Sequence, residues 1–149
     1  MLTRIIAMIS GAEGQGAPLA EPRIQREMLA AACLFAEMVR MAGNELVAER
    51  LTAIRALEER FFLSHGDAQT LHAIAERREA EVYSDFLFIE TVRHAFDDLA
   101  RAEIFADLVR IAFADGQLTR EETALLSRLA RDLAIDPASA ARILAMPGG

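Results

Sequence analysis

The residues best suited to chemistry form a short acidic turn late in the chain. Asp115 and Gly116 end an apolar stretch, and Glu122 stands seven residues after Asp115. This spacing matches the second half of an EF-hand calcium loop, in which Asp115 would be the fifth position and Glu122 the twelfth. The first half does not match, because Ile111 and Phe113 have no side-chain oxygen where that loop needs ligands. A cation bound here therefore needs carboxylates from elsewhere in the fold.

The same turn also fits a purely structural interpretation. Gly116 can end one helix in the left-handed conformation, and Thr119 can cap the next. Glu122, at the third position of that helix, can close a capping box onto Thr119. Asp115 can accept a hydrogen bond from the turn backbone. Such a cap contributes ~1 kcal/mol without any metal, so the spacing alone leaves both interpretations open.

Other reactive side chains carry weaker signals. His65 and His72 lack a third ligand at metal-binding spacing, so both are expected at the surface. His94 is expected to form a local ion pair or cap with the acidic residues that follow it. No Ser, Thr or Cys stands in a nucleophile motif, and no glycine-rich loop follows a strand. The chain is therefore not expected to be an enzyme, and catalysis would require a polar pocket around Asp85.

The acidic turn has an echo earlier in the chain. Ala42 and Glu49 frame a glycine-containing turn as Asp115 and Glu122 do, and the two copies are 73 positions apart (115 − 42 and 122 − 49). Each turn joins an apolar helix to an amphipathic one. Two helix-turn-helix units related by duplication explain this pattern. If the turn at Gly43 meets the later one, Glu49 becomes the pseudo-symmetric partner of Glu122.

The elements that must position these residues are predicted to be helices. Ala, Leu, Arg and Glu dominate, and polar and apolar residues never alternate for more than a few positions, so strands are not expected. No proline interrupts the chain between Pro22 and Pro137, as long helices require. The expected helices cover residues 22–42, 46–61, 65–79, 82–96, 99–114 and 119–133, with a last one beginning at Asp136 and Pro137.

Residues 1–21 are predicted to be a short helix followed by a linker rich in Gly and Pro, and residues 22–146 to form one helical domain. The apolar side chains within residues 2–9 are expected to pack back on the bundle, or to supply a contact for a partner or a peripheral membrane contact. The apolar stretch is too short for a signal-peptide core. No apolar run approaches the ~20 residues of a membrane-spanning helix, so no transmembrane segment is expected.

The charge balance bears on possible partners. The net charge is −7, and the 16 basic residues are all Arg and are spread along the helices. Nucleic acid requires clustered basic residues, so it is not an expected partner. An acidic surface instead favours cations and basic protein surfaces. The single cysteine, Cys33, lies in an apolar run and is expected to be buried and free, which fits a cytoplasmic protein.

Two segments resemble a known family. Residues 110–122, which read RIAFADGQLTREE, resemble the Ala-Asp-Gly turn with a later glutamate that marks the TerB family of tellurite resistance proteins. Asp85 and Phe88 are similar to the central aspartate and phenylalanine of that family. The similarity covers about residues 22–143. It implies an all-α, single-domain bundle of about seven helices in two duplicated helix-turn-helix halves, in a cytoplasmic protein of tellurite or stress resistance.

The resemblance also implies a role for the acidic residues. Acidic residues in the family hold a divalent cation, so Asp115, Glu122, Glu49 and Asp85 are the candidate ligands for calcium, magnesium or manganese. Ala42 stands where the family has aspartate, so binding is expected to be weak. Similar domains accompany J-domains in co-chaperones, where they are interaction modules. The alternative is therefore a metal-independent helical module that binds a protein partner.

Overall fold

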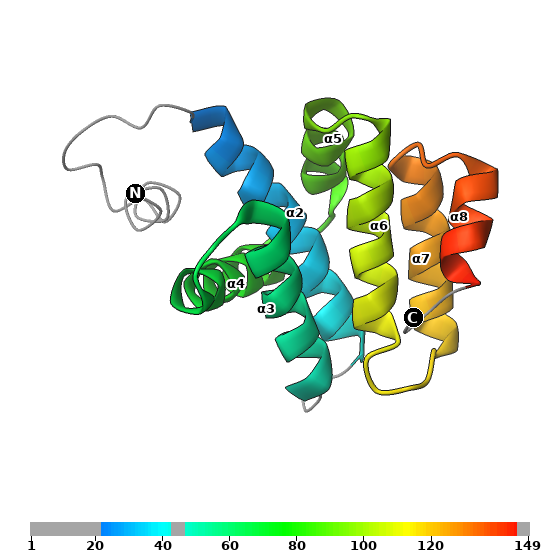
Figure 1. Ribbon diagram of the computed structural model, residues 1–149, viewed down its shortest axis with the longest axis horizontal. Coiled ribbons are helices and arrows are strands. Elements are labelled where there is room, and N and C mark those ends of the chain that lie inside the picture. The colour runs from blue at the N-terminus through cyan, green and yellow to red at the C-terminus, as the bar shows by residue number, and fades with distance from the viewer. Residues whose placement is uncertain (1–21, 43–46, 146–149) are drawn as a thin grey trace.

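Seven helices account for most of residues 22–42 and 47–145, the part of the chain that the computed structural model describes (Figure 1). In chain order they are α2 (Pro22–Ala42), α3 (Val47–Phe61), α4 (His65–Ala80), α5 (Phe86–Ala95), α6 (Asp98–Ala112), α7 (Arg120–Asp132) and α8 (Pro137–Leu144). These residues contain no strand, so the predicted all-α class is confirmed. The duplication stays a prediction. Gly43 and the predicted helix and linker of residues 1–21 lie outside the described residues.

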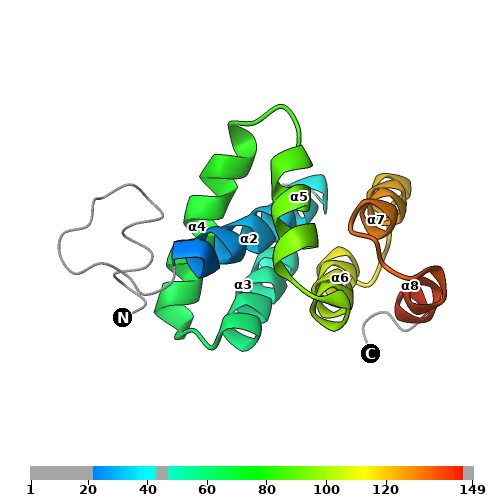
Figure 2. The same ribbon diagram turned by 90° about the horizontal axis from the view of Figure 1, so that it is seen from above.

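Helix α2 forms the centre of the bundle because its middle, residues 30–39, is apolar except at Glu37. Residues 30–39 are all buried, and Phe35 and Met38 are fully enclosed. A helix without a polar face must be surrounded by other elements, and α2 packs against α3, α4, α5, α6 and α7. Figure 2 shows α6 between the helices α2 to α5 on one side and the pair α7 and α8 on the other. Cys33 is buried and free, as predicted, and burial raises the pKa of its thiol to about 12.

Several helix starts follow the local chemistry of their first residues. The Ser64 side chain accepts a hydrogen bond from the Asp67 N–H, and the Asp97 side chain accepts one from the Ala100 N–H. Asp136 caps α8, with Pro137 in its first turn. Ser and Asp are among the residue types that favour such caps. They satisfy backbone N–H groups that have no partner inside the helix.

Helix α5 begins later than predicted. It starts at Phe86 rather than at residue 82, because the Ser84 hydroxyl accepts the Phe86 N–H and ends the preceding turn. Asp85 makes no side-chain cap bond at this helix start. The side chains of Val82 and Tyr83 therefore belong to an exposed turn between α4 and α5.

The surface position predicted for His72 was wrong, and the local ion pair predicted for His94 has a different partner. His72 is 2% exposed, because it lies on the inward face of α4 with Leu71 and Ala75. His94 pairs with Glu90, one turn earlier on α5, at 3.2 Å, and not with the acidic residues after it. In both cases the helix face decides the neighbours, since side chains four residues apart lie one above the other.

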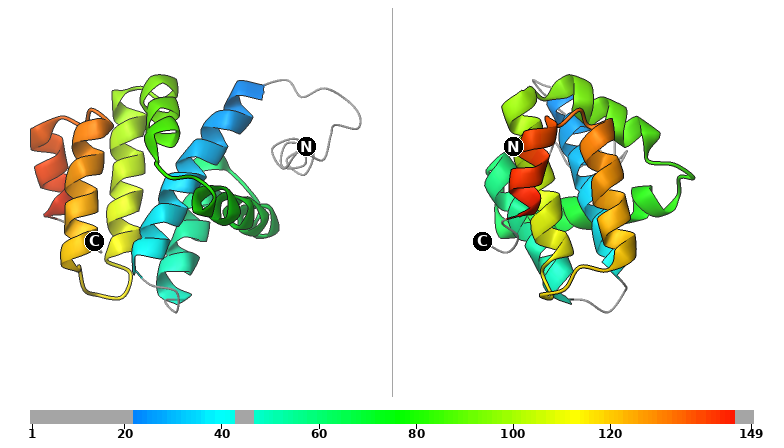
Figure 3. Two further views of the ribbon diagram at one scale, coloured as in Figure 1. Left: turned by 180° about the vertical axis from the view of Figure 1, so that it is seen from behind. Right: turned by 90° about the vertical axis from the view of Figure 1, so that its right-hand side faces the viewer.

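The connections that could hold a site lie at one end of the bundle. The end of α2, the start of α3 and the turn between α6 and α7 gather at the bottom of Figure 1, and the view from behind in Figure 3 agrees. Helix α3 packs directly on α6. This packing sets the first turn of α3 against the acidic turn. Among the described residues, no helix has the length and apolar composition needed to cross a membrane.

Candidate metal centre at the acidic turn

The acidic turn between α6 and α7 has the capping structure predicted for it. Gly116 has φ of 88°, which an L side chain rarely adopts. The Gln117 N–H donates to Asp115 Oδ1 at 3.0 Å. Thr119 Oγ1 accepts the Glu122 N–H at 3.0 Å, and Glu122 Oε1 accepts the Thr119 N–H at 2.8 Å. The two bonds between Thr119 and Glu122 form a complete capping box, and one oxygen of each carboxylate is held by a backbone N–H.

Glu49 is the unusual residue of this region. It lies in the first turn of α3 and is 0% exposed. Neither of its carboxylate oxygens makes a full hydrogen bond within the described part of the chain, although the backbone N–H groups of Glu49 and Asp115 act on this carboxylate. Burial raises the pKa of Glu49, and the nearby carboxylates of Asp115 and Glu122 raise it further. The backbone N–H groups of Glu49 and Asp115 act in the opposite direction, but the net effect is a raised pKa. The fold therefore places an unpaired buried acid beside the acidic turn.

These three carboxylates have unused oxygens and no arginine partner among the described residues. Asp115 Oδ1 and Glu122 Oε1 are each used by one backbone N–H, and the second oxygen of each bonds to no other described residue. No ion pair between any of the three and an arginine is present within residues 22–42 and 47–145. A buried carboxylate without a counterion is costly. Glu49, Asp115 and Glu122 thus form an acidic cluster with no arginine partner in the described part of the chain.

Asp85, the fourth predicted ligand, lies in a different cluster. Its two oxygens accept hydrogen bonds from Arg128 on α7, at 3.2 and 2.8 Å. Arg128 stands more than one helical turn beyond Glu122 on α7, so the structure does not bring Asp85 to the acidic turn. A carboxylate already held by a guanidinium is a poor metal ligand. Asp85 is therefore not a candidate ligand for a cation at the acidic turn.

The Asp85 cluster includes an acid that the sequence analysis missed. Glu37 on α2 is 7% exposed, its Oε1 atom has no partner among the described residues, and its Oε2 atom lies 3.7 Å from Arg128. Burial, and then the hydrogen bond and charge of Asp85, raise the pKa of Glu37 to about 8, against the charge of Arg128. Burial also acts to raise the pKa of Asp85, but hydrogen bonds from Arg128 and Glu37 outweigh it and the pKa falls. A glutamate inside the apolar run of residues 30–39 was the available signal.

The acidic cluster meets part of what a cation requires. Among the described residues, no three His, Cys, Asp or Glu side chains are grouped tightly enough to hold a metal ion. The donor set nevertheless has the right chemistry, because carboxylate oxygens suit calcium, magnesium and manganese. Both oxygens of Glu49 are unused. The residues therefore fit a cation only if the side chains of Asp115 and Glu122 turn toward Glu49 when it binds.

The domain is an all-α bundle in which an acidic turn between two helices lies beside a buried carboxylate. The family model described as Tellurite resistance protein TerB matches residues 28–145, so the chain belongs to the TerB family. The predicted resemblance is thus confirmed, and the protein contains a domain of the tellurite-resistance type. No curated protein and no solved structure matched the chain.

Proposed function

We propose that this TerB domain binds a divalent cation weakly at the acidic cluster of Glu49, Asp115 and Glu122. The observation that carries the proposal is Glu49, which is fully buried with both oxygens unpaired beside two further carboxylates. Glu49 and Glu122 are buried and Asp115 is exposed, so the two buried carboxylates, when both are ionised, repel each other in a poorly solvated place. A divalent cation offsets that repulsion and supplies the missing partner for Glu49.

Weak affinity follows from the number of ligands. Calcium takes six to eight oxygens and magnesium takes six, whereas three carboxylates offer fewer, and Ala42 contributes none. Water would complete the shell, and partly hydrated calcium sites bind with Kd on the order of 10⁻⁴ to 10⁻³ M. The proposed role is non-catalytic and belongs to stress or tellurite resistance. The free, buried Cys33 fits the reducing cytoplasm that we propose as its location.

Calorimetric titration of the whole chain with calcium, magnesium and manganese tests the cation site. We expect saturable binding in the upper micromolar to millimolar range, at least tenfold weaker binding in Glu49→Gln and Asp115→Asn, and no change in Glu121→Gln. Glu121 is the matched control, because it is an exposed glutamate next to Glu122 in the same helical turn. No binding at 10 mM metal, or equal binding by the Glu49→Gln variant, would refute the site.

A second candidate function is a metal-independent interaction module. The observation that favours it is a group of exposed apolar side chains at the turn between α4 and α5, where Tyr83 is 109% exposed and Leu87 is 71% exposed. Exposed apolar groups gathered in one place mark contact surfaces. Affinity capture from the native cell, with and without a chelator, separates the two functions. A partner retained in chelator and lost in a Tyr83→Ser variant favours the module.

A further inference from the structure

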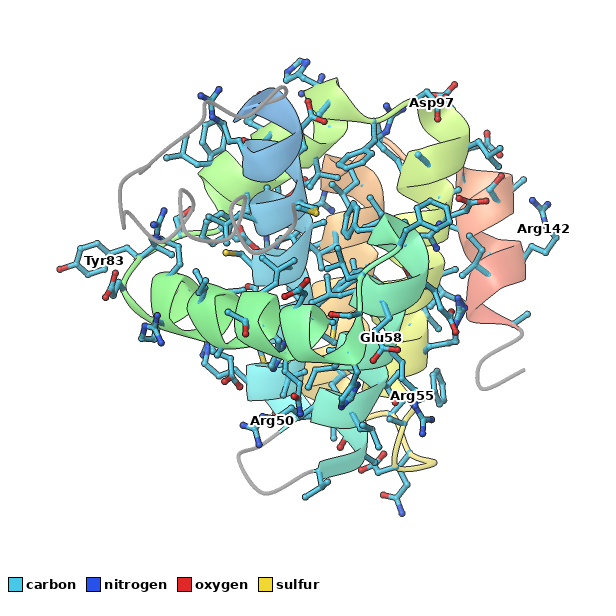
Figure 4. All side chains as sticks on the ribbon, turned by 60° about the vertical axis from the view of Figure 1, so that its left-hand side comes forward. Arg50, Arg55, Glu58, Tyr83, Asp97 and Arg142 are labelled. Atoms are coloured by element: carbon cyan, nitrogen blue, oxygen red, sulfur yellow. The ribbon has the colours of Figure 1, made fainter. Side chains whose placement is uncertain are left out.

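The turn between α4 and α5 carries a concentrated apolar surface. The α4–α5 patch consists of Val82 (39% exposed), Tyr83 (109%), Phe86 (60%) and Leu87 (71%). Figure 4 shows Tyr83 directed away from the body of the protein, and Figures 2 and 3 show the connection between α4 and α5 at the edge of the molecule. The four side chains lie within six consecutive residues, in the turn before α5 and in the first turn of that helix.

The α4–α5 patch is left over after the core is satisfied. On α5 the inward side is taken by Ile89 and Val92, which are buried, and Phe88 packs partly against the core. Leu87 lies on the opposite side of the same helix, in line with its periodicity, and Phe86 lies in the first turn of α5, where it stays 60% exposed. Folding of the single chain therefore does not use the α4–α5 patch, whose exposure is unfavourable in water.

The charges beside the α4–α5 patch are complementary to one another. Arg77, Arg78 and Glu81 are exposed, and none of them forms an ion pair with another described residue. Many other arginines do, such as Arg40 with Glu79 at 2.7 Å and Arg50 with Glu76 at 3.1 Å. A rim that carries unpaired charges of both signs can pair with a second copy of itself across a two-fold axis.

The area is sufficient for a weak dimer. Since a covered aromatic side chain buries ~150–250 Å², the exposed parts of the four side chains offer roughly 500 Å² per copy. Two copies then bury roughly 1,000 Å², which is about the minimum for a specific interface. An exposed tyrosine beside arginines also has the composition typical of interface hot spots.

We propose that the α4–α5 patch pairs with the same patch of a second copy of this chain. The two apolar surfaces cover each other, and Glu81 of one copy lies opposite Arg77 and Arg78 of the other. The proposal rests on the interaction-module candidate and names its partner. It does not involve the acidic cluster, which lies at the α6–α7 turn.

Sedimentation velocity of the full chain from ~5 to ~300 μM tests the pairing. We expect a monomer–dimer equilibrium in this range, weakened at least tenfold by the combined substitution Tyr83→Ser, Phe86→Ser and Leu87→Ser. Phe62→Ser is the matched control, since Phe62 is 93% exposed in the turn between α3 and α4, and it should leave the equilibrium unchanged. All substituted positions are exposed, and circular dichroism checks that each variant remains folded. A monomer at every concentration, or a dimer that the triple variant retains, would overturn the proposal.

Charge reversal tests the two-fold arrangement itself. Glu81→Arg alone and Arg77→Glu with Arg78→Glu should each weaken self-association several-fold, because like charges then face each other. An equimolar mixture of these two variants should restore dimers, since each then meets its opposite. Failure of the mixture to recover would overturn the pairing between copies. The chelator experiment judges the interaction module separately, because a different partner can be captured by a chain that remains monomeric.

Discussion

The proton on Glu37 should make the stability of this protein depend on pH in a way that one substitution removes. Glu37 is 7% exposed between α2, α7 and the start of α5. It faces Asp85 at the α5 start, Arg128 from α7 and, more distantly, Glu79 from α4. With a pKa of about 8 in the fold against an ordinary value of 4.5, Glu37 keeps its proton at neutral pH.

The sign follows from proton linkage. A group whose pKa is raised by folding contributes its stability fully below the unfolded value, and that stability is lost as pH rises through the folded value. For Glu37 the loss runs from about pH 4.5 to about pH 8. One pKa unit corresponds to ~1.4 kcal/mol, so the free energy of unfolding falls by roughly 3–5 kcal/mol over this range from Glu37 alone.

Glu37→Gln isolates this contribution, because an amide keeps the size of the protonated acid and can donate to Asp85 in its place. Urea unfolding followed by circular dichroism, in chelator between pH 5 and pH 9, measures both proteins. We expect equal stability within ~1 kcal/mol at pH 5 and a variant that is more stable by roughly 3 kcal/mol at pH 9. Parallel stability curves for the two proteins would refute the reasoning, since Glu37 would then be ionised throughout.

Three further perturbations have defined expectations. His72 is buried and its pKa is lowered, mainly by burial. The wild type should therefore lose stability relative to His72→Gln as pH falls below about 6.5. Urea unfolding at pH 5 and pH 7 measures the difference in unfolding free energy between the two proteins, and an equal difference at both pH values would contradict the prediction. Thr119→Ala removes half of the capping box and should cost ~1 kcal/mol, seen as a lower thermal midpoint, whereas an unchanged midpoint would mean that the box contributes little. Gly116→Ala keeps φ at 88° with no atom near the added methyl, so its cost should be conformational, ~1–2 kcal/mol, and calorimetry that finds no loss would contradict the strain.

The parts of the fold that could be predicted depend on local chemistry. The caps at Ser64, Asp97 and Asp136 were predictable because each side chain bonds a backbone N–H a few residues away. The capping box of Thr119 was predictable for the same reason. The helices themselves were predictable from the spacing of their apolar residues, which in α2 and α7 are the residues that become buried. Local patterns determine local hydrogen bonds whatever the rest of the chain does.

The clusters of buried charge could be predicted only in part, because they depend on how helices pack. Glu49 was assigned to the acidic turn through its place in the internal repeat, and the packing of α3 on α6 does set it beside Asp115 and Glu122. Asp85 was assigned to the same place, yet Arg128 binds it from α7. Nothing near Arg128 in the sequence indicates that partner, which is 43 positions away (128 − 85).

The two acidic clusters differ in how their charge is balanced, and this difference supports the proposed cation site at one of them. At the Glu37 cluster, Arg128 supplies a positive charge to Asp85, and the proton on Glu37 removes the remaining negative charge. The charge of that cluster is balanced without a ligand, and its ion pairs join α7 to α2 and to the start of α5. At the acidic turn, Glu49 has both oxygens unpaired, and no described arginine pairs with it or with its neighbours. Charge that the protein does not balance itself is balanced by a proton or a cation. The raised pKa of Glu49 means that its neighbours favour the proton when no cation is bound, and the proposed cation competes with that proton.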